Sequence, residues 1–167
     1  MPKGLLIFIA FLLVFFVLPK QAFAAFDMSL TEGSRAIDFG TMKMGEEKMI
    51  SGRGDYEQQF NFISDNARIW YFKAQLVMPF SNGRYSMPAE NFQWIVEEVK
   101  NGQGNVSTNI LTPSSFLSYP ALIYTSAGSD NTGTEVKIRL RYKLEIPERQ
   151  PAGSYTAQIR FIMVEGL

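Results

Sequence analysis

The sequence contains neither cysteine nor histidine. Without cysteine there is no disulfide, no thiol nucleophile and no zinc–thiolate centre. Without histidine the chain lacks the most common general base and the most common neutral metal ligand. A Ser-His-Asp hydrolase is therefore excluded, and a transition-metal site would have to use carboxylates alone. We expect no catalytic residues, no cofactor and no bound metal.

An excess of charge of one sign is also missing, since 16 basic residues stand against 16 acidic ones. Lys3 and Lys20 lie in the first 24 residues, so the remainder carries 14 basic and 16 acidic residues. This balance gives no electrostatic reason to expect a nucleic acid or an anionic membrane surface as a partner.

The one long apolar run, Leu5 to Leu18, covers 14 residues near the N-terminus. Lys3 precedes this run, Pro19 ends it, and Ala22-Phe23-Ala24 follows with small residues at the two positions that a signal peptidase reads. This layout predicts a secretory signal peptide at residues 1–24, cleaved before Ala25. An uncleaved anchor is the alternative, although the run is shorter than the roughly 20 residues that span a bilayer. The 143 residues that remain (25–167) suit one domain with no further membrane span.

Alternation of apolar and polar residues dominates this remainder. In residues 136–144, Val, Ile, Leu, Tyr and Leu fall on one face, and basic residues fall on the other. Such a period of two predicts a half-buried antiparallel strand. Pro151-Ala152-Gly153 supplies a turn, and residues 155–164 alternate again, so we predict a long C-terminal β-hairpin. Residues 59–62 and 69–78 predict a second hairpin-like unit in the same way.

Further short strands are predicted at residues 26–30, 37–42, 92–96 and 121–125. No segment of 12 or more residues keeps a helical period. About seven or eight strands separated by turns are typical of an all-β, immunoglobulin-like antiparallel sandwich. A small closed barrel is the alternative fold.

Three stretches carry a family resemblance. Ile37-Asp-Phe-Gly-Thr-Met-Lys-Met-Gly45 is similar to the "FGT…G" opening of many bacterial immunoglobulin-like domains. Pro151-Ala-Gly-Ser-Tyr-Thr156 and Met87-Pro-Ala-Glu-Asn-Phe92 resemble segments of secreted β-sandwich proteins, among them spore-coat-U-like proteins and archaic chaperone–usher pilus subunits. The resemblance implies a structural or fimbrial subunit of the bacterial cell envelope. The chain departs from the pilus subunits in lacking their paired cysteines.

We therefore expect an exported, non-catalytic interaction protein, located in the periplasm or at the cell surface. It would act by surface packing or by strand addition, in which an extended segment pairs with an open sheet edge. Phe26, Met28 and Leu30 mark the best candidate for the donated strand. The outward row Lys137, Arg139, Arg141 and Lys143 is the most unusual surface feature. It would contact an acidic partner, either another envelope protein, a second copy or a polysaccharide, or it is simply a solvated face.

Other candidates give alternative functions. Arg53-Gly54-Asp55 matches the tripeptide that integrins recognise, and Asn105-Val106-Ser107 matches a glycosylation acceptor. A carbohydrate-binding module would use exposed aromatic residues, for which we consider Tyr71, Tyr85 and Tyr119. A small glycosidase would need two carboxylates, and calcium would need more oxygen ligands than the pairs in this sequence supply. Those last two candidates rest on the acidic residues Glu46, Glu47, Asp55 and Glu57 and on the pairs Asp65–Asn66 and Asp130–Asn131.

Overall fold

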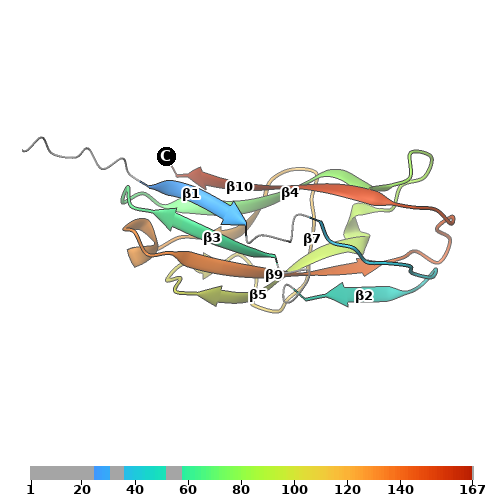
Figure 1. Ribbon diagram of the computed structural model, residues 1–167, viewed down its shortest axis with the longest axis horizontal. Helices are drawn as coiled ribbons and strands as arrows, with labels where there is room; N and C mark the ends of the chain where they lie inside the picture. Colours follow the sequence, from blue (N-terminus) through green and yellow to red (C-terminus); the bar gives the residue numbers. More distant parts are fainter. Residues whose placement is uncertain (1–24, 31–35, 52–57, 167) are drawn as a thin grey trace, which may run out of the picture.

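The computed structural model describes residues 25–30, 36–51 and 58–166, and these form two antiparallel β-sheets that face each other (Figure 1). The larger sheet has the order β1-β3-β9-β5-β7, and β2 pairs with the half of β9 that β3 leaves free. Its strands are β1 (Phe26–Leu30), β2 (Glu47–Ile50), β3 (Gln59–Ser64), β5 (Phe92–Lys100), β7 (Ser114–Ser115) and β9 (Val136–Glu145). The smaller sheet has the order β10-β4-β8-β6, with β4 (Trp70–Ser81), β6 (Asn105–Val106), β8 (Ala121–Thr125) and β10 (Thr156–Glu165).

The described residues contain short 3₁₀ turns, η2 (Ala89–Asn91) and η3 (Gly128–Asn131), and no α-helix. Among them no helix is long and apolar enough to cross a membrane. The all-β sandwich expected from the alternation is confirmed. The predicted signal peptide at residues 1–24 lies outside the described part of the chain.

The alternating faces of β9 and β4 meet in the core between the sheets. Leu140 and Tyr142 on β9, like Trp70 and Phe72 on β4, are fully buried. Phe62 on β3 stacks on Trp70 with ring centroids 5.0 Å apart, which joins the two sheets directly. Burial of each large apolar side chain stabilises the fold by roughly 1.5–3 kcal/mol, so these rows hold the sheets together.

The two predicted hairpins are wrong. β9 pairs with β2, β3 and β5 in the larger sheet, while β10 pairs with β4 in the smaller one. β3 and β4 are likewise split between the sheets. The turns at 146–155 and 65–69 therefore cross the gap of about 10 Å between the sheets instead of turning within one of them. Turn residues and alternation look the same in both cases, because each strand still presents one face to the same core.

The strand predicted at residues 37–42 is also wrong. The chain there is irregular, with Gly40 at a positive φ of 67° and a bend at Thr41. Phe39 is buried edge to face against the rings of Phe80 and Phe92, which also contact each other. However, residues 36–42 form no backbone–backbone hydrogen bond with any described residue, so they belong to neither sheet. The adjacent β2 and the two-residue strands β6 and β7 were not predicted, because four residues or fewer give too little alternation to detect.

A buried carboxylate fixes the turn between β8 and β9. Asp130, which is fully buried, accepts hydrogen bonds from the backbone amides of Gln103, Gly104 and Ala127 and from the hydroxyl of Tyr124. Burial, together with the hydrogen bond to Asp130, raises the pKa of the Tyr124 hydroxyl. With four donors around it, this carboxylate has a structural role and does not offer an open calcium ligand.

Candidate functional site

The outer edge of β10 is the main unpaired feature of the sandwich. β10 is ten residues long and pairs only with β4 among the described strands. Its inward row is Ala157, Ile159, Phe161 and Met163, and every member is only half-buried. The corresponding row of β9, which has neighbours on both sides, is fully buried. The open edge of β10 therefore leaves both backbone groups and core-facing side chains uncovered.

The irregular segment 36–42 follows β1 along the chain on the same side of the sandwich as this edge (Figure 1). Lys48 donates a hydrogen bond from Nζ to the carbonyl of Phe39, at 2.5 Å, and Gly45 N donates to Ile146 O at 2.9 Å. These bonds tie the segment to the larger sheet, while its own amides and carbonyls from 36 to 42 stay unpaired with described backbone. An open strand edge presents a row of unpaired backbone groups with which another strand can pair.

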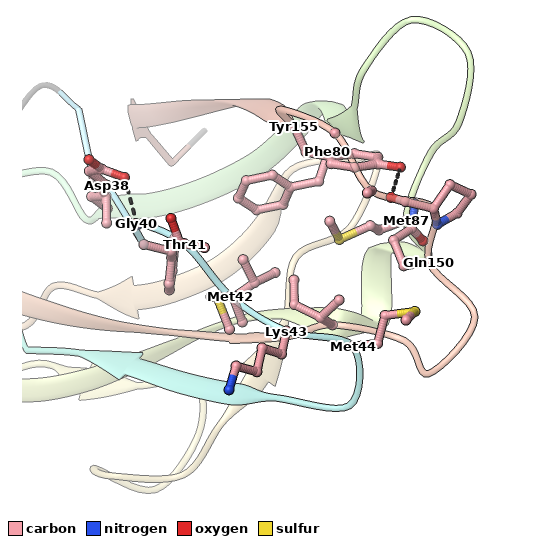
Figure 2. Close-up of a pocket in the computed structure, with 17 residues that line it drawn as sticks. Asp38, Gly40, Thr41, Met42, Lys43, Met44, Phe80, Met87, Gln150 and Tyr155 are labelled. Carbon is pink, nitrogen blue, oxygen red and sulfur yellow. Dashed lines mark hydrogen bonds between the residues drawn. The ribbon is translucent and has the colours of Figure 1, made fainter.

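A cavity of about 520 Å³ lies between this segment and the loop that precedes β10 (Figure 2). Phe80, Tyr155 and Met87 line one side of it, and Met42 and Met44 come from the facing segment. The hydroxyl of Tyr155 donates a hydrogen bond of 2.8 Å to the carbonyl oxygen of Pro151. This bond holds the loop in place. The volume of the cavity lies within the range of known small-ligand sites, and its walls are mainly apolar, as is usual for such sites.

The proposed donor segment is β1 in this structure. Phe26, Met28 and Leu30 pair with Ser64, Phe62 and Phe60 of β3, so their side chains face the core. Phe26 is exposed, and Met28 and Leu30 are only half-buried. β1 thus forms one edge of the larger sheet and contributes little fully buried surface.

The outward row of cations on β9 is matched by carboxylates. Arg141 lies 2.9 Å from Glu97, and Arg139 forms an ion pair with Glu98. A β-bulge in β5 between Val96 and Glu98 lets both consecutive glutamates reach this outer face. At the two ends of the row, the pairs Lys137–Glu135 and Lys143–Glu47 measure 3.0 and 2.8 Å. The row is therefore a ladder of ion pairs rather than a stripe of uncompensated positive charge.

The aromatic candidates do not form one platform. Trp70, Phe72, Phe92 and Trp94 are all at most 3% exposed, as the strand alternation predicts. Tyr71 lies at the beginning of β4 and Tyr85 beyond its end, which separates them by about 33 Å of strand. Tyr119 lies in the loop before β8, where Gln75 binds the neighbouring Ser118 carbonyl.

The remaining sequence candidates do not come together in a site either. Arg53-Gly54-Asp55 lies outside the described residues. Glu46 accepts a hydrogen bond from the Lys43 amide, and Glu47 pairs with Lys143. Asn66 contacts Ser64 and Glu165, and Asp130 is occupied as described above. Within the part of the chain that the structure describes, no three acidic residues cluster in a way that would hold a metal ion.

No family model, curated protein or solved structure matches this chain.

The open edge and the cavity escape sequence reasoning for a physical reason. Alternation reports which face of a strand is buried, but not whether a neighbour lies on each side of it. The signals that do exist are Pro147 and Pro151, which mark the loop, and the methionines at 42, 44 and 87, which line the cavity.

Proposed function

We propose that this protein is an exported, non-catalytic subunit of a bacterial cell-envelope assembly, which accepts an extended segment of another chain along the outer edge of β10. The half-buried inward row of β10, on an edge that no described strand covers, carries this proposal. A strand added there would pair with the free backbone groups and cover Ile159, Phe161 and Met163.

The strand order supports an immunoglobulin-like reading of the sandwich. In such domains strands A, B, E and D form one sheet, and C, F and G form the other. Here β1, β3, β9 and β5 follow one another in the order A-B-E-D, and β4 and β10 take the places of C and F. The place of G, next to β10, is filled by no described strand, and it adjoins the unpaired segment 36–42.

We propose residues 26–30 of a second copy as the donated strand. The segment alternates Phe, Met and Leu with polar residues, which matches a strand with one face on an apolar core. Its release from β3 breaks five residue pairs but exposes no fully buried side chain of the segment itself. Removal of residues 25–30 is expected to abolish assembly while leaving a folded monomer.

Cysteine cross-linking tests the pairing without background, because the chain contains no cysteine. One variant carries Ser29→Cys on the outward face of β1, and partner variants carry Gln158→Cys, Arg160→Cys or Ile162→Cys on β10. Each variant has a single cysteine, so any disulfide that forms when two variants are mixed must join two chains. We expect one of the three β10 positions to cross-link strongly, because strand pairing fixes a register.

Lys137→Cys, on the outer face of the other sheet, is the matched control and should not react with the Ser29→Cys variant. Equal cross-linking at all three β10 positions and at residue 137 would show random collision and refute strand pairing. Circular dichroism of the chain lacking residues 25–30 gives a separate check. If that chain unfolds, the segment is a structural strand and not a donor.

A further inference from the structure

The cavity beside the β9–β10 loop combines aromatic and thioether walls. Phe39 and Phe80 meet edge to face, with ring centroids 6.2 Å apart, and Tyr155 lines the same cavity. Met42, Met44 and Met87 also line it, together with the aliphatic side chains of Ile37, Leu144 and Ile146. Aromatic rings stack well on other rings, and methionine sulfur makes favourable contacts with ring edges. These walls suit a flat apolar ring.

One buried polar group in the lining has no partner. Gln150 is 7% exposed, and its side-chain nitrogen Nε2 forms no hydrogen bond with any described residue, whereas its backbone amide donates to the carbonyl of Pro147. A buried amide without a partner is costly, by about 1–3 kcal/mol. The amine of Lys43 points away from the cavity, and Asp38 accepts a hydrogen bond from the Gly40 amide (Figure 2). Among the described lining residues, the side-chain amide of Gln150 is therefore the one buried polar group that lacks a partner, and it is uncharged.

We infer that this cavity binds a small, uncharged phenolic ring, with the ring between Phe80 and Tyr155 on one side and Met42 on the facing segment, and with the hydroxyl bonded to Gln150. A phenol hydroxyl both donates and accepts, so it satisfies the amide in either orientation. No residue of β10 itself lines the cavity, so binding there can be measured in the monomer, without strand addition. The flexible methionine side chains allow the cavity to close around the ring.

Binding of p-cresol, compared with toluene, tests this inference. Ring-current shifts of the Met42 and Met87 methyl groups in NMR titrations report occupancy of the cavity. In the Gln150→Leu variant we expect p-cresol to bind roughly three- to tenfold more weakly, because one hydrogen bond is lost. Toluene should bind that variant at least as well as it binds the natural chain.

Two further variants make the result decisive. Gln158→Leu removes an exposed amide on β10 outside the cavity and should leave p-cresol binding unchanged. Thr41→Trp, at an exposed position of the cavity lining, should block both ligands without disturbing the core. The inference is overturned if p-cresol causes no saturable shift of the two methyl groups. It is also overturned if Gln150→Leu weakens p-cresol and toluene equally.

Discussion

The rings of Phe60 on β3 and Phe161 on β10 lie with centroids 4.5 Å apart, although the two strands belong to opposite sheets. Phe161 also stacks on Phe72 of β4, at 5.8 Å. Phe161 therefore packs against the core but is only half-buried, because no described strand covers the other side of β10. The other inward side chains of β10, Ala157, Ile159 and Met163, are half-buried in the same way.

Phe161→Ala should lower the free energy of unfolding by about 2 kcal/mol, less than the 3–5 kcal/mol typical of a fully buried phenylalanine. Its ring is only half-buried, so less surface is returned to water. Val164→Ala, on the outward face of β10, is the control and should cost less than about 0.5 kcal/mol. Urea denaturation measures the loss in free energy of unfolding for both variants. Equal losses would contradict the assignment of Phe161 to the inward face and of Val164 to the outward face of β10.

Asp130→Asn should destabilise the fold by about 3 kcal/mol, because several buried donors would then face an amide group instead of a carboxylate. Tyr124→Phe, which removes one hydroxyl from the same cluster, should cost about 1 kcal/mol. Thermal and urea unfolding of the two variants check the ranking. If Tyr124→Phe is the more damaging change, then Asp130 is not the centre of the cluster.

Alkaline pH should destabilise the protein. Burial raises the pKa of Tyr142, and burial with the Asp130 hydrogen bond raises that of Tyr124. In the unfolded chain both ionise near the ordinary value of about 10, while in the fold they stay protonated. Their contribution is fully present below about pH 10 and is lost above it, at roughly 1.4 kcal/mol per pH unit for each tyrosine.

Urea midpoints measured between pH 9 and 11 test this expectation, and Tyr142→Phe should make the alkaline loss shallower. A loss of stability with the same pH dependence in that variant would show that other groups are responsible.

The cation row on β9 should not retain the protein on immobilised heparin at physiological salt, because every cation faces a carboxylate. The double change Lys137→Gln and Lys143→Gln should alter stability by less than about 1 kcal/mol, since the two end pairs are partly exposed. Retention of the natural chain that disappears in the double variant would instead assign the row to an acidic partner.

The sequence predicts the faces of this fold much better than its pairings. The apolar row of residues 136–144 is buried as its alternation requires, because side-chain direction follows from the backbone of a single strand. Whether β10 pairs with β9 or with β4 depends on contacts between distant parts of the chain. Local turn residues cannot report such contacts, so the hairpin prediction fails at that point.

The candidate site shows the same division. The alternation of Phe26, Met28 and Leu30 suggests a strand, but only the structure shows it as an edge strand on β3. Gln150 follows Pro147 in a stretch that reads as an ordinary turn. Its side-chain amide lacks a partner in a cavity that residues 37–44, far away in the sequence, also line, and no local pattern encodes that neighbourhood.

Amide hydrogen exchange along β10 is the most direct measurement of strand addition. In the dilute monomer, every second amide of residues 156–165 points away from β4 and should exchange rapidly. In concentrated, assembled material these alternate amides should become protected, while the amides bonded to β4 stay protected throughout. If the amides of β10 that point away from β4 exchange as fast in assembled material as in the monomer, the proposed role of this edge is contradicted.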